Sequence, residues 1–155
     1  MDIDGKLIEW VKEYKYLGQT LSFEERLKKE LSVRKTNAWK NFWANKNILK
    51  GKFNVAAKIR TLNQCVIPTL TYGVQTWAAT GSQIEGLRTT RNSMLRSILG
   101  IRRKDKVRVE TIRQKTNVAD IGWGVRKLKL NYAGHLARGV QHLEQYLSRM
   151  DPTRI

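Results

Sequence analysis

The chain has 155 residues and a net charge of +17, from 30 Lys and Arg against 13 Asp and Glu. This length fits one domain with a small appendage, and the charge favours a polyanionic partner, with nucleic acid ahead of an anionic membrane. The single cysteine, Cys65, excludes an internal disulfide, and one Cys with two His make a structural zinc site unexpected.

Residues 1–21 are predicted to form a β-hairpin. Asp4-Gly5 is a hairpin turn signal, and the short runs Leu7–Val11 and Tyr14–Leu17 are rich in β-branched and aromatic residues. Gly18 ends the second run. Because a lone hairpin is marginal in water, we expect it to pack on helices or to belong to the edge of a larger sheet. The N-terminus lacks the basic and apolar regions of a signal peptide.

The first helix is predicted to begin at Ser22. The segment Ser22-Phe23-Glu24-Glu25 fits a capping box, and acids are also favoured at this end of the helix dipole. Apolar residues keep helical spacing from Leu27 to Phe42 if one polar residue, Arg34 or Lys35, lies on the stripe. The pattern fades near Leu49, and Lys50-Gly51-Lys52 makes the connection to the next helix.

A long uncharged run from Thr61 to Ile84 predicts the helix around which the others pack. Apolar or small residues recur at helical spacing from Ile59 to Trp77, and Asn54 suits the N-cap. Pro68 removes one backbone donor and therefore predicts a kink. Polar residues interrupt the run too often for a membrane span. We expect a kinked, mostly buried helix in which Cys65 is a buried small residue.

Three further helices are predicted. Gly81-Ser82 breaks the central helix, Ser82 caps the next helix, and Gly100 ends it. A basic link at 102–108 leads into a short helix over 107–115. The last long helix spans about 118–138. Its inward face is a set of residues at helical spacing: Ile121, Val125, Leu128, Tyr132 and Leu136.

The predicted fold is mainly α, a helical bundle of about five helices with a short N-terminal β-hairpin. It divides into the hairpin at 1–21, a helical domain at 22–139 and a C-terminal extension at 140–155. The extension is expected to be partly disordered or to form one short helix before Pro152.

The sequence contains no closely spaced group of residues of the types that catalysis requires. Two-metal phosphoryl chemistry needs clustered carboxylates, whereas among the aspartates only Asp2 and Asp4 are close together, in the predicted turn. His135 has no acid or nucleophile near it, and there is no Gly-rich phosphate loop. We therefore expect no catalytic residues, no metal site and no cofactor in this chain.

The cations are the main functional signal. Lys and Arg contacts to backbone phosphates work through counterion release and do not depend on base sequence. The charge is clustered at 102–108 and 126–129. The predicted nucleic-acid-binding residues are cations of the helical domain together with one histidine: Lys40, Lys46, Lys50, Lys52, Lys58, Arg91, Arg102, Arg103, Lys104, Arg126, Lys127, Lys129, His135 and Arg138.

Four short motifs resemble segments of the reverse transcriptases of non-LTR (LINE-type) retrotransposons, in the same order and over about residues 8–138. Tyr14–Gly18 is similar to the YLG segment that closes the palm. Cys65–Trp77 is similar to the thumb signature Cys-x-hydrophobic-Pro-x-Leu-x-Tyr-Gly-x-x-x-Trp. Met94–Ile101 with Arg103-Lys104-Asp105 resembles the run that precedes a basic R-x-D segment, and Tyr132–Arg138 resembles Trp-x-Gly-His-hydrophobic-x-Arg.

The resemblance implies the thumb and connecting region of a multidomain reverse transcriptase of the endonuclease-bearing kind. Such a thumb holds the template–primer duplex behind the active site, and the hairpin would lie near the primer end. The sequence departs from the family at Tyr132, where Trp is usual, and at Lys35, where a hydrophobic residue is usual. Because the catalytic aspartate pair of the palm is missing, this chain alone is expected to be no enzyme but part of an RNA-directed DNA polymerase.

The expected partners are nucleic acid, as a template–primer RNA/DNA hybrid, element RNA or target DNA, and the remaining reverse transcriptase domains, with no membrane. The expected location is intracellular, and nuclear within the full-length protein. Two alternatives stay open. A stand-alone helix-turn-helix-like module would bind DNA through residues 107–115 and 118–138, and a retroelement remnant would serve as a protein-interaction domain.

Overall fold

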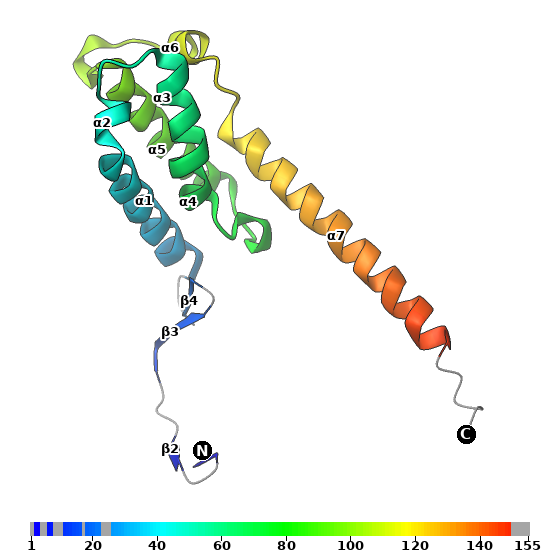
Figure 1. Cartoon of the computed structure of the whole chain (residues 1–155). Helices are drawn as coiled ribbons and strands as arrows, with labels where there is room; N and C mark the ends of the chain where they lie inside the picture. The colour runs from blue at the N-terminus through cyan, green and yellow to red at the C-terminus, as the bar shows by residue number, and fades with distance from the viewer. Residues whose placement is uncertain (1, 4–5, 8–10, 17, 23–25, 150–155) are drawn as a thin grey trace.

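The computed structural model describes residues 2–3, 6–7, 11–16, 18–22 and 26–149 of the chain (Figure 1). It is a mainly helical bundle preceded by short strands, and this confirms the predicted fold class. The helices of the described part are α1 (Arg26–Ala44), α2 (Lys46–Leu49), α3 (Val55–Thr61), α4 (Ile67–Thr71), α5 (Gly81–Leu99), α6 (Val109–Thr116) and α7 (Ile121–Arg149).

Two antiparallel hairpins precede the bundle. β1 (Asp2–Ile3) pairs with β2 (Lys6–Leu7), whereas β3 (Glu13–Tyr16) pairs with β4 (Gln19–Ser22). Asp4 and Gly5, the predicted turn, lie outside the described residues. Ser22, which was predicted to cap the first helix, is therefore the last residue of a strand. Residues 23–25 of that capping box, and residues 8–10 of the first predicted strand, lie outside the described residues.

A buried arginine joins α1 to its surroundings. Arg34 lies on the apolar stripe of α1 and is only 6% exposed. Its Nε donates to Glu30 Oε1 at 2.6 Å, its Nη2 donates to the carbonyl oxygen of Gly18, and its guanidinium lies 4.6 Å from the ring centroid of Tyr72. These partners make the burial of the charge tolerable. Arg34 thus links the second hairpin, α1 and the turn after α4.

The central helix is continuous from Val55 to Thr71, as α3, the π-helical turn η1 (Leu62–Val66) and α4. Asn54 caps it as predicted, since its side chain accepts a bond from Ala57 N–H at 2.8 Å. A kink was predicted at Pro68, which has no backbone donor. The structure has a π-helical turn at Leu62–Val66, before the proline, and Pro68 lies in the first turn of α4.

This helix ends earlier than predicted. Tyr72 leaves the helical conformation and Gly73 has a φ of +74°, so the chain turns and forms the 3₁₀-helix η2 (Val74–Thr76). Val74 and Trp77 are nonetheless buried. The spacing therefore predicted the burial of these two residues correctly, although the prediction that they continue the central α-helix is wrong. Cys65, which was expected to be buried, is exposed.

α5 and α6 follow the predicted order with one shifted cap. Thr80, rather than Ser82, caps α5, because the Thr80 hydroxyl accepts from Gln83 N–H and the Gln83 side chain accepts from Thr80 N–H. Gly100 ends α5 with a φ of +71°, as predicted. α6 buries Ile112 against the bundle.

α7 is longer and less buried than predicted. It continues through Arg149, well beyond residue 138. Ile121 and Val125 are buried, but the rest of the predicted inward face is exposed, because α7 extends away from the other helices (Figure 1). The exposed fractions are 40% for Leu128, 37% for Tyr132 and 50% for Leu136. Among the described residues, no helix has the length and apolar character needed to cross a membrane.

Candidate nucleic-acid interface

The first group of predicted cations lies where α1 ends and α2 and α3 begin. From Leu31 to Ile84 the sequence contains no Asp or Glu. Lys40 on α1, Lys46 on α2, and Lys50 and Lys52 after it are exposed, whereas Lys58 on α3 is partly buried. The absence of acids along this stretch leaves the lysines without nearby carboxylates from their own segment.

The second group is formed by three consecutive cations between α5 and α6. Arg102 precedes the 3₁₀-helix η3 (Arg103–Asp105), which contains Arg103 and Lys104. All three are exposed. Asp105 Oδ2 accepts a bond from the backbone N–H of Arg102 at 2.7 Å, which closes the turn. The local fold therefore uses the acid of this segment to hold the backbone.

The two groups lie at the same end of the bundle. Lys50 Nζ donates to the carbonyl oxygen of Ser97 in the last turn of α5 at 2.6 Å, and α3 also contacts α6. Figure 1 shows α2, the start of α3 and α6 together at that end. We call this set of side chains the basic end: Lys46, Lys50, Lys52, Arg102, Arg103 and Lys104. Within the described part of the chain none of them forms an ion pair.

The predicted cations on α7 are placed differently. Arg126 and Lys127 are exposed, and Lys129 Nζ donates to the carbonyl oxygen of Trp77 at 2.7 Å, which ties α7 to the segment after η2. His135 and Arg138 are exposed on the part of α7 that extends away from the bundle (Figure 1). The structure therefore does not bring His135 and Arg138 to the basic end.

Arg91 is a predicted phosphate ligand that the structure places in the interior. It is 8% exposed, and its Nη1 donates to the carbonyl oxygen of Ala119. Its Nε has no acceptor among the described residues. Burial penalises the charge and lowers the pKa of Arg91 to about 10. The prediction for Arg91 thus needs correction, because this side chain joins α5 to the segment before α7 instead of facing solvent.

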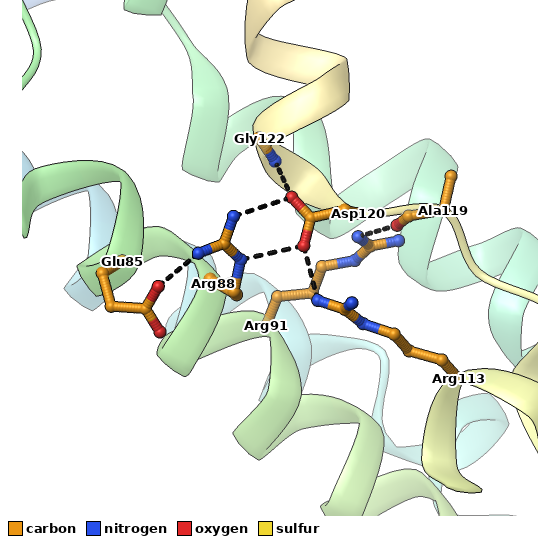
Figure 2. A network of polar contacts seen from close by, with 7 residues as sticks. All are labelled: Glu85, Arg88, Arg91, Arg113, Ala119, Asp120 and Gly122. Carbon is orange, nitrogen blue, oxygen red and sulfur yellow. Dashed lines mark hydrogen bonds and ion pairs between the residues drawn. The ribbon is translucent and has the colours of Figure 1, made fainter. Parts of the chain in front are cut away.

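A polar network that the sequence analysis missed surrounds Asp120 (Figure 2). Arg88 donates from Nε and Nη2 to the two carboxylate oxygens at 2.8 and 3.0 Å, and Arg113 Nη2 donates to Oδ2 at 2.5 Å. The backbone N–H of Gly122 donates to Oδ1 at 2.7 Å, so Asp120 also caps the start of α7. Arg88 pairs with Glu85 as well.

This network ties α5, α6 and α7 together. The bonds from Arg88 first, and then those from Gly122 and the nearby arginine charges, lower the pKa of Asp120 from 3.8 to about 2. Asp120 and Glu85 in turn raise the pKa of Arg88. An isolated acid directly before an apolar helical pattern was the signal that could have predicted the cap. The arginines of this network are engaged in structure, unlike those of the basic end.

Among the described residues, no three His, Cys, Asp or Glu side chains lie close enough together to hold a metal ion. What the basic end offers is a group of exposed cations that form no ion pairs among the described residues. Such a group attracts polyanions at long range and holds phosphates without needing a precise geometry.

Comparison with known proteins shows a similarity to a transposon-derived protein. No model of a known protein family matches the chain, and no solved structure matches it. The chain is similar to a putative uncharacterized transposon-derived protein of Caenorhabditis elegans. The two are 33% identical over 132 residues, which is 83% of this chain and 47% of the nematode protein. The chain therefore spans about half the length of this relative. It is a basic helical bundle with a transposon-derived homologue.

Proposed function

We propose that this chain is the nucleic-acid-binding part of a transposon-derived protein and that it holds a duplex by its backbone phosphates. The observation that carries this proposal is the basic end, where cations from two distant segments gather without carboxylate partners among the described residues. Phosphate contacts of this kind position a duplex without reading its sequence.

The four sequence motifs and the transposon-derived relative support a finer proposal, the thumb of a non-LTR retrotransposon reverse transcriptase. Its ligand would be a template–primer RNA/DNA hybrid or element RNA, and its site of action the nucleus. In this proposal the motif from Cys65 to Trp77 acts through packing, since Val66, Leu70 and Val74 are buried. Catalysis would belong to other domains.

The test is a fluorescence anisotropy titration of the chain with a labelled RNA/DNA hybrid at several salt concentrations. We expect affinity to fall steeply with salt and to depend little on sequence. The triple variant Arg102→Ala/Arg103→Ala/Lys104→Ala should lower the salt slope of log K against log salt by about 3, because each phosphate contact contributes roughly one unit.

A matched control keeps the charge at the same positions. The variant Arg102→Lys/Arg103→Lys/Lys104→Arg should retain the wild-type slope, because counterion release depends on charge. No affinity for the hybrid at low salt would refute the proposal. A strong preference for one DNA sequence over a scrambled competitor would instead support a helix-turn-helix-like module formed by α6 and α7.

The uncovered face of α7 favours a second candidate, contact with another protein or with the remaining reverse transcriptase domains. Leu128, Leu136 and Val140 are 40%, 50% and 56% exposed along this helix. Clustered exposed apolar residues are typical of protein contacts. Chemical cross-linking that links α7 to a co-expressed polymerase segment would support this candidate, and Leu136→Glu should abolish the cross-link.

A further inference from the structure

A hollow at the basic end contains an exposed aromatic side chain, which binding of phosphates does not require. It is lined by Trp43, Lys46, Asn47, Lys50 and Gly51, and its volume is about 490 Å³. We call it the Trp43 hollow. It is a shallow hollow that is open to solvent. Trp43 comes from the last turn of α1, and the other residues come from α2 and the turn that follows it.

The indole of Trp43 is exposed and yet held in place. It is 52% exposed, while its ring stacks on Trp39 with centroids 6.3 Å apart and an interplanar angle of 25°. The edge contact with buried Phe42 has centroids 5.4 Å apart at 84°. An aromatic ring that is supported by two others loses little freedom when a further flat ring stacks on it.

Lysines lie near this ring in the sequence, and two of them, Lys46 and Lys50, also line the hollow. Lys46 lies three residues after Trp43 and Lys40 three residues before it, and both are exposed. Lys50 is anchored by its bond to Ser97 and has further donors free to bind a ligand. Lys50 also belongs to the basic end, so the hollow and the proposed phosphate surface are continuous. A negatively charged ligand with a flat aromatic group satisfies both features at once.

We propose that the Trp43 hollow binds an unpaired nucleotide of a nucleic-acid strand, with its base stacked on Trp43 and its phosphates bound by Lys46 and Lys50. Bases within a duplex have their faces covered by neighbouring bases, whereas an unpaired base offers a free face. The amide of Asn47 is available for the edge of the base. This inference rests on the proposed function and adds single-stranded nucleic acid to its ligands.

The experiment compares two labelled ligands of equal duplex length, one blunt and one with a six-nucleotide unpaired overhang, in anisotropy titrations with the full chain. We expect the wild-type chain to bind the overhang ligand more tightly. Trp43→Ala should weaken binding of the overhang ligand about tenfold, in line with the loss of one stacked base, and change blunt-duplex binding less than twofold. Trp43→Phe should keep most of the preference.

Trp123→Ala is the matched control. Trp123 is 64% exposed on α7 but does not line the hollow, so the ratio of the two affinities should stay at its wild-type value. Equal losses on both ligands for Trp43→Ala, or no loss on either, would overturn the inference. An acidic peptide that competes with the overhang only in the wild-type chain, and not in Trp43→Ala, would also overturn it in favour of a protein ligand.

A second measurement does not depend on how the variants fold. An overhang carrying 5-iodouracil should form a photo-cross-link to Trp43, identified by mass spectrometry, and cross-links confined to other residues would overturn the inference. Failure of the proposed function looks different, because neither ligand would then bind at low salt. If the blunt duplex binds tightly and in a salt-dependent way, and the overhang adds no affinity, the inference about the Trp43 hollow is refuted while the proposed function stands.

Discussion

The carboxylate of Asp120 accepts bonds from side chains on two helices and from the backbone of a third. Arg88 on α5, Arg113 on α6 and the N–H of Gly122 on α7 all donate to it. One residue thus fixes where α7 leaves the bundle. Its side chain is 27% exposed, so solvent screens these charges in part.

Replacing Asp120 should separate its charge from its role as a cap. Asp120→Asn should lower the free energy of unfolding by about 1–2 kcal/mol, because it leaves Arg88 and Arg113 without their carboxylate while Asn still caps the helix. Asp120→Ala should cost about 1 kcal/mol more, since the cap is lost as well. Urea denaturation checks both values, and equal costs for the two variants would contradict this division.

The same carboxylate predicts a pH dependence. Its pKa is lowered from 3.8 to about 2 in the folded chain. A lowered carboxyl pKa gives stability that is present above the unfolded pKa and is lost as the pH falls through the folded pKa. Unfolding measured between pH 5 and about pH 2 should therefore show a loss of about 1 kcal/mol in the wild type, after solvent screening, that Asp120→Asn does not show.

The buried pair of Glu30 and Arg34 predicts strong non-additivity. Their side chains are 3% and 7% exposed. Arg34→Met or Glu30→Met alone should each cost about 3 kcal/mol, because each change breaks the ion pair and leaves the other charge buried. The double variant should cost less than either single variant. Chemical denaturation of all four proteins gives the coupling energy, and additive losses would show that the two charges act independently.

At the scale of single elements, glycine determines where two helices end. Gly73 and Gly100 adopt φ values of +74° and +71°, which L-residues rarely adopt. Gly73 ends the central helix even though the apolar spacing continues to Trp77. Backbone conformation thus overrides side-chain periodicity at this point.

Gly100 and Gly81 form a matched pair for testing this effect. A Cβ at either position would meet no atom within 4 Å, so the two differ in backbone conformation and not in space. Gly100→Ala should cost about 1 kcal/mol of stability, because of its positive φ. Gly81→Ala, at the start of α5, should be neutral or slightly stabilising. Thermal unfolding distinguishes them, and similar shifts for both would rule out the backbone explanation.

At the scale of the whole molecule, the core includes only the beginning of α7. Val125 is 1% exposed and Leu136 is 50% exposed, although both lie on the same predicted face. Val125→Ala should therefore cost about 2 kcal/mol, whereas Leu136→Ala should change stability by less than about 0.5 kcal/mol. Urea midpoints of the two variants measure this, and a large cost at Leu136 would show that another part of the chain covers it.

The whole molecule also decides which cations can meet a ligand. Arg91 and Arg102 are indistinguishable as charges in the sequence, yet Arg91 is buried against Ala119 and Arg102 is exposed. The basic end arises because Lys50 meets the end of α5, a contact between distant segments. No local pattern around either segment contains that information.

The helical class, the Asn54 and Gly100 caps and the burial of most apolar residues in the central helix could be predicted from the sequence, because they depend on local hydrogen bonding and on spacing. The remaining features depend on the tertiary structure. It buried Arg34 rather than Lys35, placed Arg91 inside, formed the Asp120 network and left most of α7 uncovered. The physical reason is that burial and ion pairing depend on which distant segments meet, and periodicity within one helix does not specify its neighbour.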